Sequence, residues 1–202
     1  MTQHITSRAS CKHCHYPQKT CVCAAIIPMK CAVQVTILQD PSESQHAKNT
    51  ARLIPLILPN CDIIVGNTPE DFAALCTRLH PEIAQGHCAV IYPSPSALCV
   101  ENLATTNNTS SRPPFSHLIL LDGSWRKAKK IWLSNPWLHT LPVLSFAQVP
   151  DGQYHIRHTQ LTDSLSTLEA LAHTLQIGFG VDTMPLHHIF SAMQAHWPKR
   201  PQ

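Results

Sequence analysis

The clearest change in the pattern of apolar and polar residues occurs between residues 116 and 133. His117 to Leu121 form a short, largely apolar run that ends at Asp122, which favours a strand buried on both faces of a parallel sheet. From Trp125 onward, apolar residues recur at offsets of three, four and seven, which is the spacing of a helix. This stretch therefore predicts a strand, a turn and a helix.

Predicted strands and helices alternate through most of the chain. Further strands are predicted at 31–38, 61–65, 88–92 and 143–146. Further helices are predicted from residue 49, at 69–79, from 165 to about 176 and at 185–196, whereas the polar stretch 101–114 predicts a loop. This alternation favours an α/β fold with a mostly parallel sheet flanked by helices.

Two predicted turns place reactive side chains at the carboxyl edge of this sheet, where open α/β folds bind ligands. One turn contains Asp122, followed by the free backbone N–H groups that begin a helix. The other follows the first strand and contains Lys48, Asn49 and Arg52, which suit phosphate or a carboxylate. A helix cap at Asn49 beside two solvated cations also explains the second turn, so both interpretations stay open.

The charge of the chain is too small for a strongly basic field around the whole molecule. The formal net charge is +3 over 202 residues, so RNA binding would depend on local patches such as residues 126–130. The sequence has no apolar run of about eighteen residues, and its first residues lead into no segment of the signal-peptide type. We therefore expect a cytoplasmic protein without a membrane span.

Four of the nine cysteines lie close together near the start of the sequence. Cys11, Cys14, Cys21 and Cys23 have a spacing that suits tetrahedral zinc, and the metal would stabilise a segment too poor in apolar residues to fold alone. Four thiolates leave no open coordination position, so this zinc would be structural. Free thiols that happen to cluster are the alternative. We expect a zinc-binding segment at 1–30 and an α/β catalytic domain at 31–202.

Three motifs follow the cysteines in order. The first is Asn-Thr-Ala-Arg at 49–52, the second is Asp122-Gly123-Ser124-Trp125, and the third is Tyr-His-Ile-Arg at 154–157, followed by Leu-Ser-Thr-Leu-Glu-Ala at 165–170. Together they resemble the DTW-domain family, whose name motif is Asp-x-Thr-Trp. This chain has serine in place of the threonine, and it has Asp-Pro-Ser-Glu at 40–43 where many members have His-Pro-x-Glu.

The resemblance implies a SPOUT-related enzyme that modifies RNA, and it leaves open whether the fold is knotted. DTW-domain proteins include tRNA-uridine aminocarboxypropyltransferases, which use S-adenosylmethionine as co-substrate. The implied reaction moves the 3-amino-3-carboxypropyl group to N3 of a tRNA uridine and releases methylthioadenosine. The implied partners are therefore tRNA and S-adenosylmethionine, and we expect a monomer.

The resemblance also implies roles for individual residues. Asp122 would be the general base that removes the N3 proton, or else an acceptor that orients uracil or the amino group of the cofactor. The residues implied to bind the cofactor are Pro93, Ser94, Leu121, Gly123, Ser124, Trp125, Leu165, Ser166 and Thr167. The residues implied to contact RNA are Lys48, Asn49, Arg52, Arg126, Lys127 and Lys130, and Arg52 could instead pair with the carboxylate of the cofactor.

Several residues, and the chain as a whole, admit a second interpretation. Ser166 and Glu169 have the spacing of a helix capping box, and Trp125 fits the apolar stripe of its helix. An RNA methyltransferase, which would release S-adenosylhomocysteine, is one alternative function. A zinc-bearing RNA-binding protein without catalysis is the other.

Overall fold

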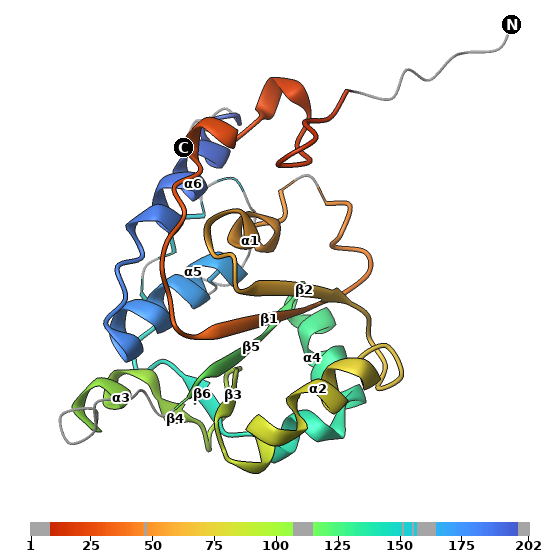
Figure 1. The fold of residues 1–202 in the computed structure, drawn as a ribbon, viewed down its shortest axis with the longest axis vertical. Coiled ribbons are helices and arrows are strands. Elements are labelled where there is room, and N and C mark those ends of the chain that lie inside the picture. The colour runs from red at the N-terminus through yellow and green to blue at the C-terminus, as the bar shows by residue number, and fades with distance from the viewer. Residues whose placement is uncertain are drawn as a thin grey trace, which may run out of the picture.

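Six strands of the described residues form a single parallel sheet (Figure 1). The structure is a computed structural model that describes residues 9–46, 48–106, 115–150, 152–154, 156 and 165–197. The strands lie in the order β2-β1-β5-β3-β6-β4, and every neighbouring pair is parallel. The predicted α/β fold with a parallel sheet flanked by helices is therefore confirmed.

The predicted strands agree closely with those of the structure. The strands are β1 (Gln34–Gln39), β2 (Cys61–Val65), β3 (Cys88–Ile91), β4 (Leu98–Cys99), β5 (His117–Asp122) and β6 (Val143–Ser145). The α-helices are α1 (Ile54–Ile57), α2 (Ala73–Ala84), α3 (Val100–Thr106), α4 (Trp125–Ser134), α5 (Thr167–His173) and α6 (Met184–Gln194). A π-helix at Thr174–Gly178 continues α5. Within the described ranges, no helix is both long and apolar enough to cross a membrane.

Helices cover both faces of the sheet, and each face has its own hydrophobic core (Figure 1). On one face, α2 and α4 pack over Leu38 and Ile119. On the other face, α1, α5 and α6 pack over Ile37 and Leu118. Neighbouring residues of one strand belong to opposite cores because successive side chains point to opposite faces. This two-sided burial explains why the strands have apolar runs instead of an alternating pattern.

The described residues 9–30, which contain the clustered cysteines and are called the cysteine segment, pack against the core that includes α1, α5 and α6. Tyr16, Val22 and Met29 of this segment are buried in that core, together with Ile54 of α1. The backbone N–H of Met29 also donates to the carbonyl of Ile57 at 2.9 Å. The segment and the sheet therefore share one hydrophobic core, and the division at residue 30 stays a prediction from the sequence.

The prediction of a loop at 101–114 is wrong for its first part, where α3 follows the short edge strand β4. Val100 and Leu103 of α3 are buried, and a Cβ added to Gly178 would lie 3.1 and 3.3 Å from their methyl groups. The helix is therefore stabilised by contacts with a distant part of the chain, which its local polar composition does not reveal. Residues 107–114 lie outside the described residues.

The helix predicted at 69–79 begins and ends later than expected, because α2 spans Ala73–Ala84. The carboxylate of Asp71 accepts from the backbone N–H groups of Asn67 and Thr68 at 2.8 and 2.9 Å. A turn therefore occupies the residues predicted for the first helical turn. The helix continues through Pro81, where packing of its apolar face outweighs the loss of one hydrogen bond.

Candidate active site at the carboxyl edge of the sheet

Asp122, the last residue of β5, is buried, and its carboxylate accepts three hydrogen bonds from the residues that the structure describes. Oδ2 accepts from Nε2 of Gln39 at 2.8 Å and from Nδ2 of Asn49 at 2.7 Å. Oδ1 accepts from the hydroxyl of Thr167 at 2.5 Å. Asp122 is only 5% exposed, so these donors replace the water that a carboxylate needs. Three segments distant in sequence therefore converge on this residue.

The sheet register brings Gln39 to Asp122. The two residues are direct partners in the parallel pair of β1 and β5, and each ends its strand. The next backbone N–H, that of Asp40, donates to the carbonyl of Asp122 at 3.0 Å. Our sequence analysis missed Gln39, for which the only signal was a polar residue at the end of an apolar strand.

Asn49 and Arg52 form contacts inside the protein. The Asn49 side chain, whose Nδ2 binds Asp122, also accepts from the backbone N–H of Arg52 through Oδ1 at 3.1 Å. The predicted cap at Asn49 is displaced by one residue, because the chain here forms the 3₁₀ helix Ala51–Leu53, whose N-cap is Thr50. The Asn49 side chain still accepts from the backbone of this helix. The guanidinium of Arg52 donates to the carbonyl of His15 at 2.9 Å and lies 4.3 Å from the ring centroid of Tyr16. Arg52 therefore joins this turn to the cysteine segment.

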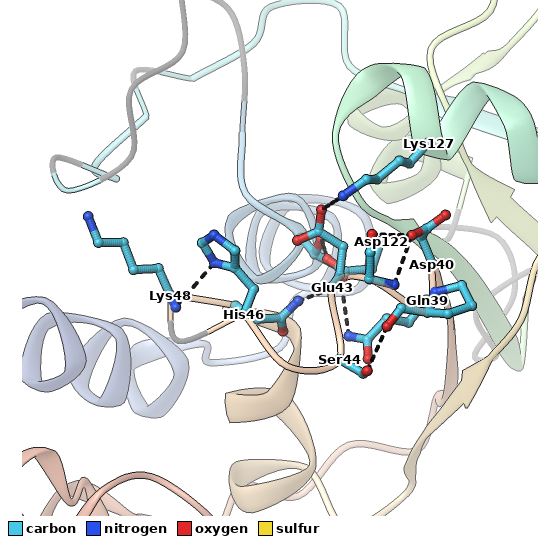
Figure 2. Close-up of polar contacts among 12 residues, drawn as sticks. Gln39, Asp40, Glu43, Ser44, His46, Lys48, Asp122 and Lys127 are labelled. Carbon is cyan, nitrogen blue, oxygen red and sulfur yellow. Dashed lines mark hydrogen bonds and ion pairs between the residues drawn. The ribbon is translucent and has the colours of Figure 1, made fainter. Parts of the chain in front are cut away.

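An ion pair and a buried acid lie beside this network (Figure 2). The ammonium of Lys127 contacts the carboxylate of Glu43 at 2.7 Å, and the two side chains are 29% and 13% exposed. Asp40 accepts from the N–H and hydroxyl of Ser42 at 3.0 and 2.5 Å. Burial alone would raise the pKa of Asp40, but the hydrogen bonds from Ser42 and the charge of Lys127 hold that pKa below its ordinary value. Lys127, a predicted RNA contact, is therefore already paired with an acid.

The N-terminus of α5 brings Thr167 to Asp122. The predicted capping box is confirmed: the Ser166 N–H donates to Oε2 of Glu169 at 2.8 Å, and the Glu169 N–H donates to Oγ of Ser166 at 3.3 Å. Oε1 of Glu169 also accepts from the backbone N–H of Gln153 at 2.5 Å. The capping box therefore fixes both the start of α5 and a neighbouring segment.

Five of the residues predicted to bind the cofactor follow β3 or β5 at this edge: Pro93, Ser94, Gly123, Ser124 and Trp125. Ile91 of β3 is paired with Leu120 of β5, so Pro93 and Ser94 follow β3 beside the turn at Gly123. A Cβ added to Gly123 would lie 2.8 Å from Cβ of Lys127, so the close approach of α4 requires glycine there. Leu121 differs from the others, since its side chain packs against the core on the α2 and α4 side.

The start of α4 leaves polar groups available at the same edge. Ser124 is the N-cap, and its carbonyl accepts from the N–H groups of Lys127 and Ala128 at 2.8 and 2.9 Å. Among the described residues, the Ser124 hydroxyl makes no capping hydrogen bond to α4.

The prediction that Trp125 belongs to the apolar stripe is wrong, because Trp125 is 42% exposed whereas Ala128 is buried. The exposed indole therefore lies directly after the turn that contains Asp122.

The remaining basic residues occupy different environments. Arg126 and Lys130 are exposed on α4, and Lys129 is exposed beside them. Lys48 is partly buried, and its ammonium donates to the carbonyl of Ile156 at 2.9 Å. Of the predicted RNA contacts, Arg126 and Lys130 are therefore the ones that the structure presents to solvent.

The four clustered cysteines form a compact group of thiols. Their Sγ atoms all lie within 4.8 Å of one another, with 3.5 Å between Cys11 and Cys23 and 3.7 Å between Cys14 and Cys21. Tetrahedral zinc with Zn–S bonds of about 2.3 Å requires sulfur atoms roughly 3.8 Å apart, so the geometry suits this ion. Backbone N–H groups of Cys14 and His13 lower the pKa of Cys11 to about 6, whereas burial and the neighbouring thiols raise the pKa of Cys23 to about 12. The first thiolate of the group is therefore favoured at Cys11.

The DTW domain matches residues 8–198 of this chain. The chain belongs to the DTW-domain family. Asp122 is therefore the aspartate of the DTW motif, and its hydrogen-bond partners Asn49 and Thr167 belong to the two other motifs identified in the sequence. Gln39 and Tyr16, in contrast, join this DTW-domain site from positions that the motifs did not indicate.

Curated relatives of this DTW-domain chain share one name. The chain is 29% identical over 178 residues to tRNA-uridine aminocarboxypropyltransferase 2 of Drosophila melanogaster, a match that covers 84% of the chain and 66% of the fly protein. It is 27% identical over 181 residues to the Mus musculus protein of that name, covering 87% of the chain and 58% of the mouse protein. The matches thus span about two-thirds or less of these relatives. No solved structure matches the chain.

Proposed function

We propose that this protein is a tRNA-uridine aminocarboxypropyltransferase. The reaction breaks the bond between the sulfonium of S-adenosylmethionine and its 3-amino-3-carboxypropyl group, and it joins that group to N3 of a uridine. The N3 proton leaves, and methylthioadenosine is released. The observation that carries the proposal is the burial of the DTW-motif aspartate at the carboxyl edge, held by residues of the other family motifs, in a chain whose curated relatives bear this name.

The start of α4 supports S-adenosylmethionine as the co-substrate. Its first backbone N–H groups, at Trp125 and Arg126, have no partner from the preceding helical turn and suit the carboxylate of the transferred group. The Ser124 hydroxyl adds a donor at the same edge. Pro93 and Ser94 would bound the pocket on the β3 side, and Leu165 to Thr167 would bound it on the α5 side. The N–H groups and hydroxyl at the start of α4 support the proposal, since they are donors that suit a carboxylate.

Asp122 would contact the reacting uracil. A carboxylate oxygen can accept about two hydrogen bonds, so Oδ2 is saturated by Gln39 and Asn49, whereas among the described residues Oδ1 accepts from the Thr167 hydroxyl alone. We propose that Oδ1 accepts the N3–H group and then its proton as the N–C bond forms. The donors on Oδ2 fix the plane of the carboxylate, which aims Oδ1 at the substrate.

RNA would bind along the outer face of α4. Trp125, Lys129 and Leu133 lie one helical turn apart on one line of this helix, and Arg126 and Lys130 form the adjacent line. All five are exposed. Cations beside an exposed indole suit a phosphate backbone with an unpaired base stacked on the ring. Because this line begins three residues after Asp122, a bound RNA could deliver one base to the carboxylate.

Three finer features belong to the same proposal. The four thiols would hold one structural zinc ion, which their spacing fits. The fold would be of the SPOUT type, in line with the family resemblance. The enzyme would act in the cytoplasm, where its proposed substrate tRNA is found, and as a monomer.

Incubation with S-adenosylmethionine and unmodified tRNA, followed by mass spectrometry of nucleosides and small molecules, tests the proposal. We expect methylthioadenosine and an aminocarboxypropyl-uridine in equal amounts. S-adenosylhomocysteine with a methylated nucleoside would make the protein a methyltransferase. Binding of RNA that is unaffected by S-adenosylmethionine, without any product, would favour a non-catalytic RNA-binding protein.

A further inference from the structure

Two tyrosine hydroxyls from opposite parts of the chain donate to consecutive carbonyls in the turn that carries Asn49. The hydroxyl of Tyr16, in the cysteine segment, donates to the backbone carbonyl of Asn49 at 3.2 Å. The hydroxyl of Tyr154 donates to the carbonyl of Lys48. The Lys48 ammonium donates to the carbonyl of Ile156, two residues after Tyr154. The backbone at 48–49 is therefore held from two sides.

The turn between the first two cysteines sets the position of Tyr16. The Cys11 N–H donates to the carbonyl of Tyr16 at 2.7 Å, and the His15 N–H donates to the carbonyl of Cys11 at 3.0 Å. His15 has a φ of 59°, a left-handed conformation that residues other than glycine rarely adopt. Tyr16 itself is fully buried. The orientation of its ring thus depends on how the chain folds around Cys11 and Cys14.

A second contact ties the same two segments together. Arg52, whose backbone N–H is capped by Asn49, places its guanidinium over the Tyr16 ring and donates to the carbonyl of His15. Tyr16 therefore contacts both the backbone of Asn49 and the side chain of Arg52. The Asn49 carboxamide, in turn, is the group that meets Oδ2 of Asp122. A continuous series of contacts leads from the cysteine segment to the carboxylate.

We propose that Tyr16 is a positioning residue that acts through Asn49 to orient the carboxylate of Asp122. The cysteine segment is then part of the catalytic apparatus in addition to stabilising the fold. Its folding around the four thiols places the Tyr16 hydroxyl, which fixes the Asn49 backbone and so the angle at which the carboxamide meets Asp122. The kinetic consequence rests on the proposed transferase activity, whereas the structural link does not.

A double-mutant cycle tests whether Tyr16 acts through Asn49. Tyr16→Phe removes the hydroxyl and keeps the ring under Arg52, and Asn49→Ser keeps a helix-capping oxygen but is too short to donate to Asp122. We expect Tyr16→Phe to lower kcat by about five- to tenfold, with KM for S-adenosylmethionine unchanged within about twofold. In the Asn49→Ser background, the same change should have no further effect on kcat. The proposal would be overturned if Tyr16→Phe lowered kcat equally in both backgrounds, or if it left kcat of the otherwise wild-type protein unchanged.

Thr20→Val is the matched control within the cysteine segment. It removes a hydroxyl that donates to the carbonyl of Pro17 at 3.3 Å, without touching Asn49. We expect kcat to stay at the wild-type value. If Thr20→Val lowers kcat as much as Tyr16→Phe does, the effect is general loosening of the segment, and the positioning role is rejected.

The side-chain amide resonances of Asn49 give a measurement that does not depend on the reaction. In nitrogen-15 spectra of the full chain, we expect Tyr16→Phe to shift these resonances, whereas Thr20→Val should leave them unchanged. A shift in a protein without transferase activity would support the link between Tyr16 and Asn49 while rejecting the proposed function. Unshifted resonances in Tyr16→Phe would reject the link itself.

Discussion

At the scale of single residues, the site depends on how the hydrogen bonds of Asp122 are distributed. Oδ2 accepts from the side-chain amide nitrogens of Gln39 and Asn49. An amide nitrogen can donate a hydrogen bond but cannot accept one. Oδ1 receives a hydroxyl from Thr167, which can also accept. The two oxygens therefore differ chemically: one is fixed by the fold, and the other faces a partner that can rearrange.

This difference makes Asp122→Asn a conservative test. The asparagine oxygen can keep the donors from Gln39 and Asn49, and its amide can donate to the Thr167 hydroxyl, so we expect a loss of stability below about 2 kcal/mol. Turnover should fall by about 100-fold or more at every pH between roughly 6 and 9, since an amide cannot take the N3 proton. Turnover is measured as methylthioadenosine released, with thermal unfolding of the variant as the control for folding. Near-normal turnover at high pH would exclude Asp122 as the base.

At the scale of secondary-structure elements, α4 separates two tasks between its faces. Ala128 and Ile131 are buried against the sheet, and Lys127 pairs with Glu43 beside Asp122. The opposite face carries exposed basic and apolar residues. One short helix can therefore anchor the turn that contains Asp122 and also present a surface for RNA.

We expect the double substitution Lys129→Gln and Lys130→Gln to weaken tRNA binding without changing the fold. Each lost phosphate contact should reduce the slope of log Kd against log salt by about 0.9, so the difference from wild type should disappear at high salt. Binding is measured by fluorescence anisotropy at several salt concentrations.

The control removes two charges elsewhere, through Lys12→Gln and Lys19→Gln in the cysteine segment, where both residues are exposed. A larger loss of affinity in the control than in the α4 variant would show that RNA follows the cysteine segment instead.

At the scale of the whole molecule, the ends of the described chain meet in one core. Tyr16 and Met29 of the cysteine segment share that core with Phe190 and Met193 of α6. Figure 1 shows the cysteine segment beside α6, on the side of the sheet away from α2 and α4. A change in the cluster of four thiols is therefore expected to destabilise the whole shared core, including α6, and not the cysteine segment alone.

Metal removal tests this expectation. We expect one zinc ion per chain by elemental mass spectrometry, and chelation should lower the midpoint of thermal unfolding by about 5 °C or more, because several kcal/mol of metal binding are lost. Cys21→Ser should reproduce the fall without a chelator. Cys76→Ser, a change of a partly buried cysteine in α2, should leave the metal content at the wild-type level. An unchanged midpoint after complete metal loss would show that the core does not depend on the thiol site.

The sequence by itself determined most of the elements of this protein and the identity of its motifs. The apolar runs that form β1, β3 and β5 are buried on both faces, which is a local property of composition, and the capping box at Ser166 is a contact between residues three positions apart. Asp122 was recognised for the same reason, since a carboxylate that ends an apolar strand and precedes a helix is visible in a few consecutive residues.

Only the tertiary structure decided which side chains meet. Gln39 reaches Asp122 through strand register, Tyr16 reaches Asn49 across the core, and α3 is stabilised by contact with the π-helix at Thr174–Gly178. These pairs are distant in sequence, and no local preference encodes them. The pairing of Lys127 with Glu43 is likewise a contact between distant residues. In the sequence, Lys127 cannot be distinguished from the exposed basic residues beside it. Long-range packing, not local pattern, determines which polar residues of this edge remain available to a substrate.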